Sequence, residues 1–288
     1  MKKIKIRVEN LHKTFREEEV LKGITCDFEA GKTHAIVGNN GSGKSVLFKC
    51  ICGFIKPTEG TITIDDKVIG KDVDFPESMG MIIERPGFLP NMSGFRNLKL
   101  LAEIQGKITD TEIRNTISRV GLDPDSKKAV AKYSLGMKQR LGIAITLLNN
   151  PEFLILDEPT VGLDPKERVK FRKLISSFAS EKIVLLSTHI VSDIEYIADE
   201  IIILKKGRIE NTGTIRYLLK DINKCVWECL VPEKEVNRIE QVYTVSNRKY
   251  GEDGVVLRLI SREKPFANAK QVDPVLEDLY LFYFREGE

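Results

Sequence analysis

Hydrophobic and polar positions alternate along the first part of the chain. Residues 3–10 place apolar and charged side chains in turn, which is typical of a strand with one exposed face. Residues 25–28 and 61–65 are further short strand candidates, so we expect a small antiparallel sheet. Three later segments are apolar runs of the kind found in parallel strands covered on both faces: 33–37, 153–156 and 183–186.

A helical period replaces this pattern in the middle of the chain. Apolar residues recur at helical spacing at Phe95, Leu98, Leu101 and Ala102. Thr109 and Glu112 then form the pattern of a capping box, and Gly121 closes the helix that follows. Residues 92–132 are therefore predicted to be a helical insertion. With the next helix, the helical subdomain covers about 92–150.

Beyond residue 213 the pattern changes again. Segments 225–231 and 255–259 look like strands, and 274–284 is an aromatic-rich helix whose aromatic residues we interpret as a packing face. We expect two domains, 1–213 and a small appended α+β domain, 214–288. The predicted fold class is α/β, with a mostly parallel central sheet, an N-terminal antiparallel β subdomain and the helical subdomain.

A phosphate-loop pattern, G-x-x-x-x-G-K-[ST], follows the apolar run 33–37. Its residues, with the next one in the helix, are Gly38, Asn39, Asn40, Gly41, Ser42, Gly43, Lys44, Ser45 and Val46. The glycines let backbone amides curl around phosphate oxygens, and the positive end of the following helix points at the same anion. Lys44 is expected to reach the β- and γ-phosphates, and Ser45 to ligate Mg²⁺. The chain is therefore predicted to bind a nucleoside triphosphate.

Carboxylates and a histidine follow the other predicted buried strands. Asp157 and Glu158 come directly after 153–156, where Asp157 could hold Mg²⁺ directly or through water and Glu158 could act as a base on an attacking water. His189 ends the strand that begins at 183, and Glu84 ends an apolar strand that begins at 79. Because ligands bind at the carboxyl ends of such strands, we expect Lys44, Glu158 and His189 to converge.

Ser134 and Gly136 stand at the start of another helix. They form a second potential anion site, although an ordinary serine N-cap explains Ser134 equally well. Phe15 lies in the first turn of the N-terminal sheet, where its ring could stack on a base or simply pack.

Composition excludes several classes of function. The net charge is +3, from 45 basic and 42 acidic residues without a long block of one sign, so nucleic acid is not an expected partner. No apolar run approaches the ~18 residues that cross a bilayer, and the start of the chain leads into a strand pattern, so we expect a cytoplasmic protein. The five cysteines lack paired spacing, which predicts buried free thiols rather than disulfides or zinc ligands.

This ordered set of motifs resembles the ATP-binding cassette of ABC transporters over about residues 3–213. By this resemblance residues 38–45 are Walker A, Phe15 is the adenine-stacking position and Glu84 occupies the Q-loop position. Residues 133–137 correspond to the signature motif, and Asp157 and Glu158 to Walker B and the catalytic glutamate. Asp164 then lies in the D-loop, and His189 is the switch histidine. The resemblance implies Mg²⁺-dependent ATP hydrolysis, with Glu84 near the metal. It also implies a dimer of cassettes, identical or not, in which Ser134 and Gly136 act on the partner's nucleotide, and a separate polytopic membrane subunit that holds the chain at the cytoplasmic face of the membrane.

Two departures from the family pattern point to one branch. Glu84 stands where the family usually has glutamine, and the segment 133–137 reads Tyr-Ser-Leu-Gly-Met. Together they resemble the cassettes of bacitracin-resistance and lantibiotic-immunity exporters of Gram-positive bacteria, which implies export of an antimicrobial peptide or another drug-like compound. The alternative is a soluble ABC ATPase of translation or DNA repair. That class normally has tandem cassettes or a long coiled-coil insertion, and this sequence shows neither a repeat nor heptads.

Overall fold

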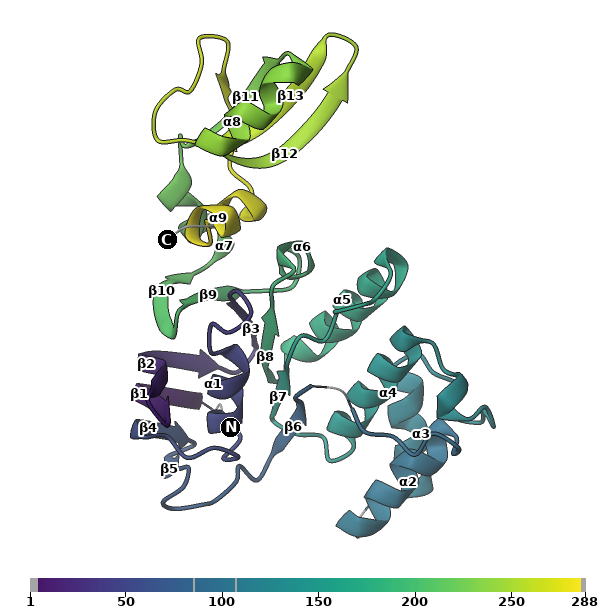
Figure 1. Cartoon of the computed structure of the whole chain (residues 1–288). Helices are drawn as coiled ribbons and strands as arrows, with labels where there is room; N and C mark the ends of the chain where they lie inside the picture. Colours follow the sequence, from purple (N-terminus) through teal and green to yellow (C-terminus); the bar gives the residue numbers. More distant parts are fainter. Residues whose placement is uncertain (1–4, 85, 107, 286–288) are drawn as a thin grey trace. The chain divides into compact units, whose positions relative to one another are not determined.

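The computed structural model describes residues 5–84, 86–106 and 108–285. Contacts divide the chain into two units, Met1–Glu210 and Asn211–Glu288, close to the change of pattern seen in the sequence (Figure 1). Lys3 and Ile4, the first residues of the expected N-terminal strand, lie outside the described residues. Within the described part of the chain, no helix is both long and apolar enough to cross a membrane.

The first unit contains a sheet of six strands in the order β10-β9-β3-β8-β7-β6. The strands are β3 (Lys32–Val37), β6 (Met79–Ile82), β7 (Phe153–Leu156), β8 (Ile183–Thr188), β9 (Glu200–Lys205) and β10 (Arg208–Gly213), which runs across the division between the units. The β6/β7, β7/β8, β8/β3 and β3/β9 pairs are all parallel. Every residue of β7 and β8 is buried, which confirms the interpretation of their apolar runs.

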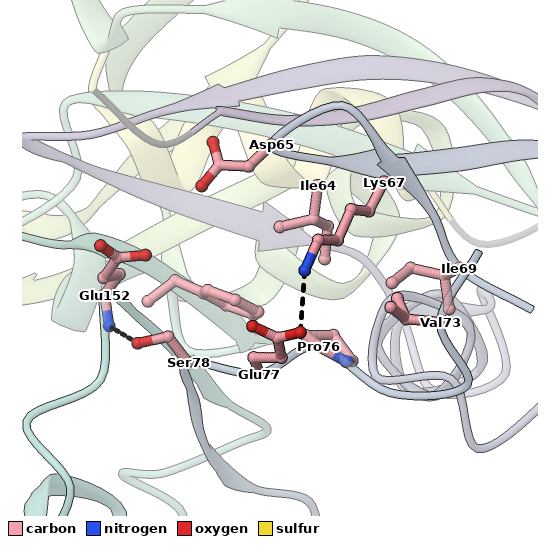
Figure 2. A pocket seen from close by; sticks show the side chains of 10 residues that line it. Ile64, Asp65, Lys67, Ile69, Val73, Pro76, Glu77, Ser78 and Glu152 are labelled. Carbon is pink, nitrogen blue, oxygen red and sulfur yellow. Dashed lines mark hydrogen bonds and ion pairs between the residues drawn. The ribbon is translucent and has the colours of Figure 1, made fainter. Parts of the chain in front are cut away.

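A second sheet in this unit is antiparallel, as the alternating pattern predicts. Its order is β2-β1-β4-β5, formed by β1 (Lys5–Phe15), β2 (Glu18–Glu29), β4 (Glu59–Ile64) and β5 (Lys67–Val68). One core joins its inner face to α1 (Lys44–Ile51) and to the central sheet, with Leu47 and Phe48 of α1 fully buried. A cavity of about 110 Å³ opens beside the β4–β5 turn, where Lys67 pairs with Glu77 at 2.8 Å (Figure 2).

The helical subdomain has the helices that the period predicted. They are α2 (Gly94–Gln105), α3 (Asp110–Arg119) and α4 (Leu135–Leu147), with a short 3-10 turn at Val130–Lys132 before α4. The capping box of Thr109 and Glu112 is present at the start of α3. The chain then returns to the central sheet, where α5 (Pro165–Ala179) packs against β8 and β3 and a short α6 (Val191–Ile194) follows β8.

The second unit is a four-stranded antiparallel sheet with its own core. Its strands, in the order β12-β13-β11-β14, are β11 (Val226–Val231), β12 (Thr244–Gly251), β13 (Gly254–Ile260) and β14 (Lys270–Gln271). Its helices are α7 (Ile215–Leu218), α8 (Val236–Val242) and α9 (Leu276–Tyr283), with 3-10 turns at Leu219–Ile222 and Glu233–Glu235. The strands β11 and β13 and the helix α9 were predicted, whereas β12, β14 and α8 were not.

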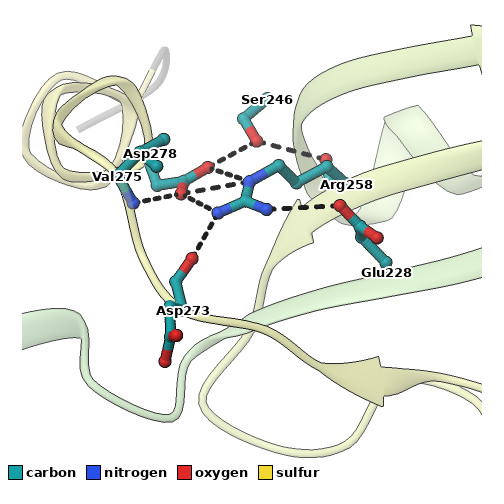
Figure 3. Close-up of polar contacts among 6 residues, drawn as sticks. All are labelled: Glu228, Ser246, Arg258, Asp273, Val275 and Asp278. Atoms are coloured by element: carbon teal, nitrogen blue, oxygen red, sulfur yellow. Dashed lines mark hydrogen bonds and ion pairs between the residues drawn. The ribbon is translucent and has the colours of Figure 1, made fainter.

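A buried ion pair attaches α9 to this second sheet (Figure 3). Asp278 of α9 is fully buried, and its carboxylate accepts hydrogen bonds from the guanidinium of Arg258, at 2.8 Å for the shortest, from the Ser246 hydroxyl at 2.6 Å and from the backbone N–H of Val275 at 2.9 Å. The hydrogen bonds to Asp278 raise the pKa of Arg258 above its ordinary value. A buried charge needs this degree of pairing, so the network fixes where α9 begins.

The cysteines only partly follow the prediction. All five are free thiols, and Cys50, Cys52 and Cys229 are buried. Cys26 and Cys225 are only partly buried, so the prediction of a buried thiol holds in part at these two positions. Cys26 lies on the same face of β2 as Ile24 and Phe28 and packs against the core, and burial raises the pKa of its thiol to about 12.

Candidate functional site

The predicted phosphate loop connects β3 to α1. Gly43 has φ +105°, and a Cβ at this position would lie 2.8 Å from Leu21 Cδ2, so both the backbone angle and the space require glycine. The Lys44 ammonium is 6% exposed and donates to the carbonyl oxygens of Gly38 at 2.7 Å and Asn39 at 3.1 Å. The lysine thus folds back over its own loop, where an incoming phosphate would compete for the same donors.

The carboxylates after β7 are held by the neighbouring strand β8. The Ser187 hydroxyl donates to Asp157 Oδ1 and accepts the backbone N–H of Glu158 at 2.9 Å. Asp157 is 6% exposed, and Glu158 has φ +46°, a left-handed conformation that is unusual for a residue other than glycine. Ser187 was missed by the sequence analysis, although it is a polar residue directly after the apolar run 183–186; its strand pairs with β7 in the structure.

Lys44, Glu158 and His189 come together, as the strand-end argument expected. Glu158 Oε1 lies 3.4 Å from Lys44 Nζ, and Glu158 Oε2 lies 2.9 Å from His189 Nδ1. Within the described residues, Glu158 Oε1 is buried without a hydrogen bond and keeps only this longer ion pair. This carboxylate oxygen therefore lacks the hydrogen bond that most buried polar groups have.

An open pocket of about 640 Å³ lies beside Glu158 and His189. It is lined by Asn40, Ser45, Glu84, Pro86, Phe88, Leu135, Lys138, Gln139, Asp157, Glu158, Val161, Gly162 and His189. The pocket therefore joins the phosphate loop, the ends of three strands and the start of α4. Its size is within the range of sites for small ligands and cofactors.

The oxygen donors in this pocket suit Mg²⁺. Ser45 supplies a hydroxyl, and Asp157 and Glu84 supply carboxylates, which are the hard ligands that this ion prefers. Among the residues that the structure describes, no group of three or more His, Cys, Asp or Glu side chains could hold a metal ion. A magnesium ion here would therefore need further oxygens from nucleotide phosphates and water.

Glu84 lies two residues beyond β6, with φ +66°. Its carboxylate is 3.0 Å from Lys49 Nζ, and its side chain is 74% exposed. The structure thus places Glu84 at the wall of the pocket and gives it a cationic partner that the sequence analysis did not identify.

Of the predicted phosphate-loop segment 38–46, only Asn40 and Ser45 line this pocket. Outside that segment, four predicted site residues are not among its lining: Phe15, Ser134, Gly136 and Asp164. The Ser134 side chain caps α4 by accepting the backbone N–H of Met137 at 3.2 Å, and Asp164 caps α5 by accepting that of Glu167 at 2.9 Å. Phe15 is 41% exposed at the end of β1, with the Lys13 ammonium 4.8 Å from its ring centre. None of these contacts gives the four residues a role in the pocket of their own chain.

The Glu167 side chain explains the glycine at position 136. A Cβ on Gly136 would lie 2.4 Å from Glu167 Oε2 and 2.8 Å from its Cγ. Glu167 is itself held by Arg140 at 3.4 Å and Lys170 at 2.7 Å. Any larger residue at 136 would therefore displace a carboxylate that ties the start of α4 to α5.

Comparison with known proteins agrees with this arrangement. Residues 21–161 match the family model described as ABC transporter. The chain is 37% identical over 206 residues to the lantibiotic transport ATP-binding protein SrtF of Streptococcus pyogenes, which covers 71% of this chain and 88% of SrtF. It is 34% identical over 255 residues to the bacitracin transport ATP-binding protein BcrA of Bacillus licheniformis, which covers 87% of this chain and 83% of BcrA.

A solved structure adds the same result for the fold. The structure of cbiO1 from Clostridium perfringens, described as part of the ABC transporter complex cbiONQ, superimposes with a TM-score of 0.65 and 25% identity, over 82% of this chain and 98% of that chain. With BcrA matched over most of its length, the chain belongs to the ABC transporter family, as an ATP-binding subunit whose ATP hydrolysis is coupled to transport.

Proposed function

We propose that this chain drives an exporter for an antimicrobial peptide or another drug-like compound, and that this export protects the cell from the compound. The observation that carries the proposal is the similarity to SrtF and BcrA, whose names refer to lantibiotic and bacitracin transport. The carboxylate at Glu84 and the Tyr-Ser-Leu-Gly-Met segment are the features that first indicated this branch.

In the proposed reaction each residue of the site has a separate role. Lys44 leaves its loop carbonyls for the β- and γ-phosphates, and Glu158 orients the attacking water and accepts its proton. His189 holds Oε2 of Glu158, which fixes the orientation of the carboxylate. Ser45, Asp157 and Glu84 would hold Mg²⁺, which neutralises charge on the transferred phosphate when it is bound.

The proposed assembly has two cassettes and a separate polytopic membrane subunit. Phe15, Ser134, Gly136 and Asp164 lie outside the pocket of their own chain, so we assign Ser134, Gly136 and Asp164 to the nucleotide of a second cassette and Phe15 to the adenine. The second cassette can be a copy of this chain or a related one. This assembly would hold the chain at the cytoplasmic face of the membrane.

Removal of this chain from its host tests the transport proposal. We expect a deletion strain to be inhibited at lower concentrations of bacitracin or of a lantibiotic, and the parent chain expressed from a plasmid to restore growth, whereas Glu158→Gln should not. Unchanged sensitivity to every such compound would contradict export of this class. Purification of the chain from membranes tests the alternative, since recovery with ribosomes or DNA instead of a polytopic protein would favour translation or repair.

Two substitutions separate binding from chemistry. Lys44→Ala removes the cation that meets the phosphates and should weaken ATP binding. Glu158→Gln keeps the shape of the site but removes the base, so it should bind ATP and remain in an ATP-held dimer without turnover. Normal turnover by Glu158→Gln would contradict the role assigned to Glu158.

A mixture of two inactive subunits tests the assignment across the dimer. Lys44→Ala fails at its own phosphate loop, and Gly136→Asp places a side chain where the Glu167 carboxylate lies. A hybrid dimer of the two keeps one composite site without either lesion. We therefore expect partial recovery of nucleotide-driven dimerisation and hydrolysis, and no recovery would contradict action on the partner's nucleotide.

A further inference from the structure

The ion pair between Glu84 and Lys49 connects two walls of the nucleotide pocket. Lys49 lies in the last turn of α1, the helix that begins at the phosphate loop with Lys44. Glu84 follows the strand β6 and lines the pocket together with Ser45 and Asp157. The contact of 3.0 Å therefore joins a proposed metal ligand directly to the helix that carries the phosphate loop.

The ion pair is exposed to solvent, so the Glu84 carboxylate can exchange Lys49 for another partner. The Glu84 side chain is 74% exposed and that of Lys49 is 31% exposed, so water screens the interaction. Ion pairs of this kind are weak and do not lock a structure. A divalent ion bound to phosphates in the same pocket is a stronger partner for a carboxylate than a single ammonium group.

An unpaired Glu84 would have a cost before the metal enters. Its negative charge faces a pocket that must accept the charged phosphates of ATP, and like charges in one pocket repel. The Lys49 ammonium reduces this repulsion by keeping a positive charge next to the carboxylate. Lys49 thus affects ATP binding in two opposite ways, depending on whether Mg²⁺ is present.

We propose that Lys49 is a positioning residue that holds Glu84 at the pocket wall in the metal-free state and competes with Mg²⁺ for its carboxylate. This inference depends on the proposed role of Glu84 near the metal. It makes Lys49 the residue that sets the Mg²⁺ concentration at which the nucleotide site is filled. The usual glutamine of the family has no charge for such an ion pair, so the device depends on the carboxylate of this chain.

The test is the binding of a non-hydrolysable, fluorescent ATP analogue to four proteins: the parent, Lys49→Met, Glu84→Gln and the double variant. Without Mg²⁺, Lys49→Met should bind the analogue about two- to fivefold more weakly, because Glu84 is no longer neutralised. When Mg²⁺ is titrated at fixed analogue, Lys49→Met should reach half-saturation at a Mg²⁺ concentration about two- to fivefold lower. Glu84→Gln alone should need more Mg²⁺ than the parent, both for analogue binding and for half-maximal hydrolysis.

The decisive comparison is made in the Glu84→Gln background, where Lys49→Met should change neither quantity. If Lys49→Met has the same effect with Gln as with Glu at position 84, Lys49 acts on the phosphates directly and the inference is wrong. No effect of Lys49→Met on the parent would also overturn it. Failure of all four folded proteins to bind the analogue would instead overturn nucleotide binding itself, which is a separate result.

A matched control is Lys99→Met. Lys99 also forms an exposed ion pair, with Asp110 at 3.1 Å, but in the helical subdomain and outside the pocket lining. Its loss should leave the analogue affinity and the Mg²⁺ midpoint unchanged. Circular dichroism of each variant verifies that it is folded.

Discussion

The central sheet has the same three residue types at its two ends, in different environments. One cluster follows the carboxyl ends of β3, β7 and β8, and the other lies at the amino ends of β3 and β9; Figure 1 labels these strands. At the carboxyl ends, Glu158 lies between Lys44 at 3.4 Å and His189 at 2.9 Å, beside an open pocket. At the amino ends, Glu200 pairs with Lys32 at 2.9 Å and with His34 at 3.2 Å. A lysine, a histidine and a glutamate therefore meet at both ends of the central sheet.

The two clusters differ in exposure and surroundings. Within the described residues, each has one buried atom with an ion pair but no hydrogen bond, Glu158 Oε1 and His34 Nδ1. His34 is completely buried, and its Nε2 accepts the backbone N–H of Glu29 at 3.1 Å while Nδ1 faces Glu200. The His189 side chain is 41% exposed, and His189 and Glu158 both line the pocket. Residue types alone do not distinguish the two clusters, whereas a pocket beside an exposed histidine does.

The largest expected difference is in turnover. Glu158→Gln should lower the rate of ATP hydrolysis by a factor of about 10² to 10⁴, because it removes the proposed general base. Glu200→Gln should leave the rate per folded molecule unchanged, because Glu200 lies at the opposite end of the sheet from the pocket. Steady-state phosphate release from both purified proteins checks this pair, and equal losses would remove the distinction between the two ends.

The sequence predicted the carboxyl-end cluster because strand direction places it. Apolar runs define β7 and β8, parallel pairing brings their ends together, and the phosphate-loop pattern marks the end of β3. The amino-end cluster could not be predicted in this way. Lys32 and His34 belong to β3 itself, and their partner Glu200 is far away in the sequence and becomes a neighbour only through the β3/β9 pairing.

Elements without a hydrophobic signal were also missed. The strand β12 is an edge strand whose second half, from Asn247 to Gly251, is exposed, so it needs few apolar residues. The pair of Arg258 and Asp278 joins residues of β13 and α9 that no local pattern relates. Lys49 was missed for the same reason, since its partner Glu84 is 35 positions further along the chain.

The free energy of unfolding should depend more on the amino-end cluster than on the carboxyl-end cluster. Glu200→Ala leaves the buried Nδ1 of His34 without its partner and removes one carboxylate from Lys32, so the free energy of unfolding should fall by about 1–3 kcal/mol. Glu200→Gln keeps an oxygen that can accept from His34 and should recover part of the loss. Urea unfolding followed by far-ultraviolet circular dichroism measures both; Trp227, the single tryptophan, lies in the second unit and would not report on this sheet. An unchanged midpoint for Glu200→Ala would mean that the amino-end cluster is not structural.

Ser187 sharpens the comparison within the carboxyl-end cluster. Ser187→Ala removes the donor to Asp157 and leaves the backbone N–H of Glu158 without its acceptor. We expect hydrolysis to fall about tenfold, equivalent to ~1.4 kcal/mol, because both carboxylates lose their orientation. Ser177→Ala is the control, since Ser177 is an exposed serine that bonds only to a carbonyl of its own helix. If the two variants hydrolyse ATP equally, Ser187 does not position the carboxylates.

The smallest expected effect is a dependence of stability on pH that arises from His34. Burial lowers the pKa of His34 below the ordinary value of about 6.5, although the charge of Glu200 opposes this. Below that ordinary value the unfolded chain binds a proton at this histidine that the folded chain does not, so stability is lost as the pH falls. The slope is at most about 1.4 kcal/mol per pH unit, between the unfolded pKa and the lowered folded pKa. Lys32 and Asp199 also face this site, but both remain in His34→Gln, so a comparison of that variant with the parent at pH 7.5 and 5.5 isolates the histidine. The parent should lose more stability than His34→Gln on acidification, and equal losses would show that another group titrates.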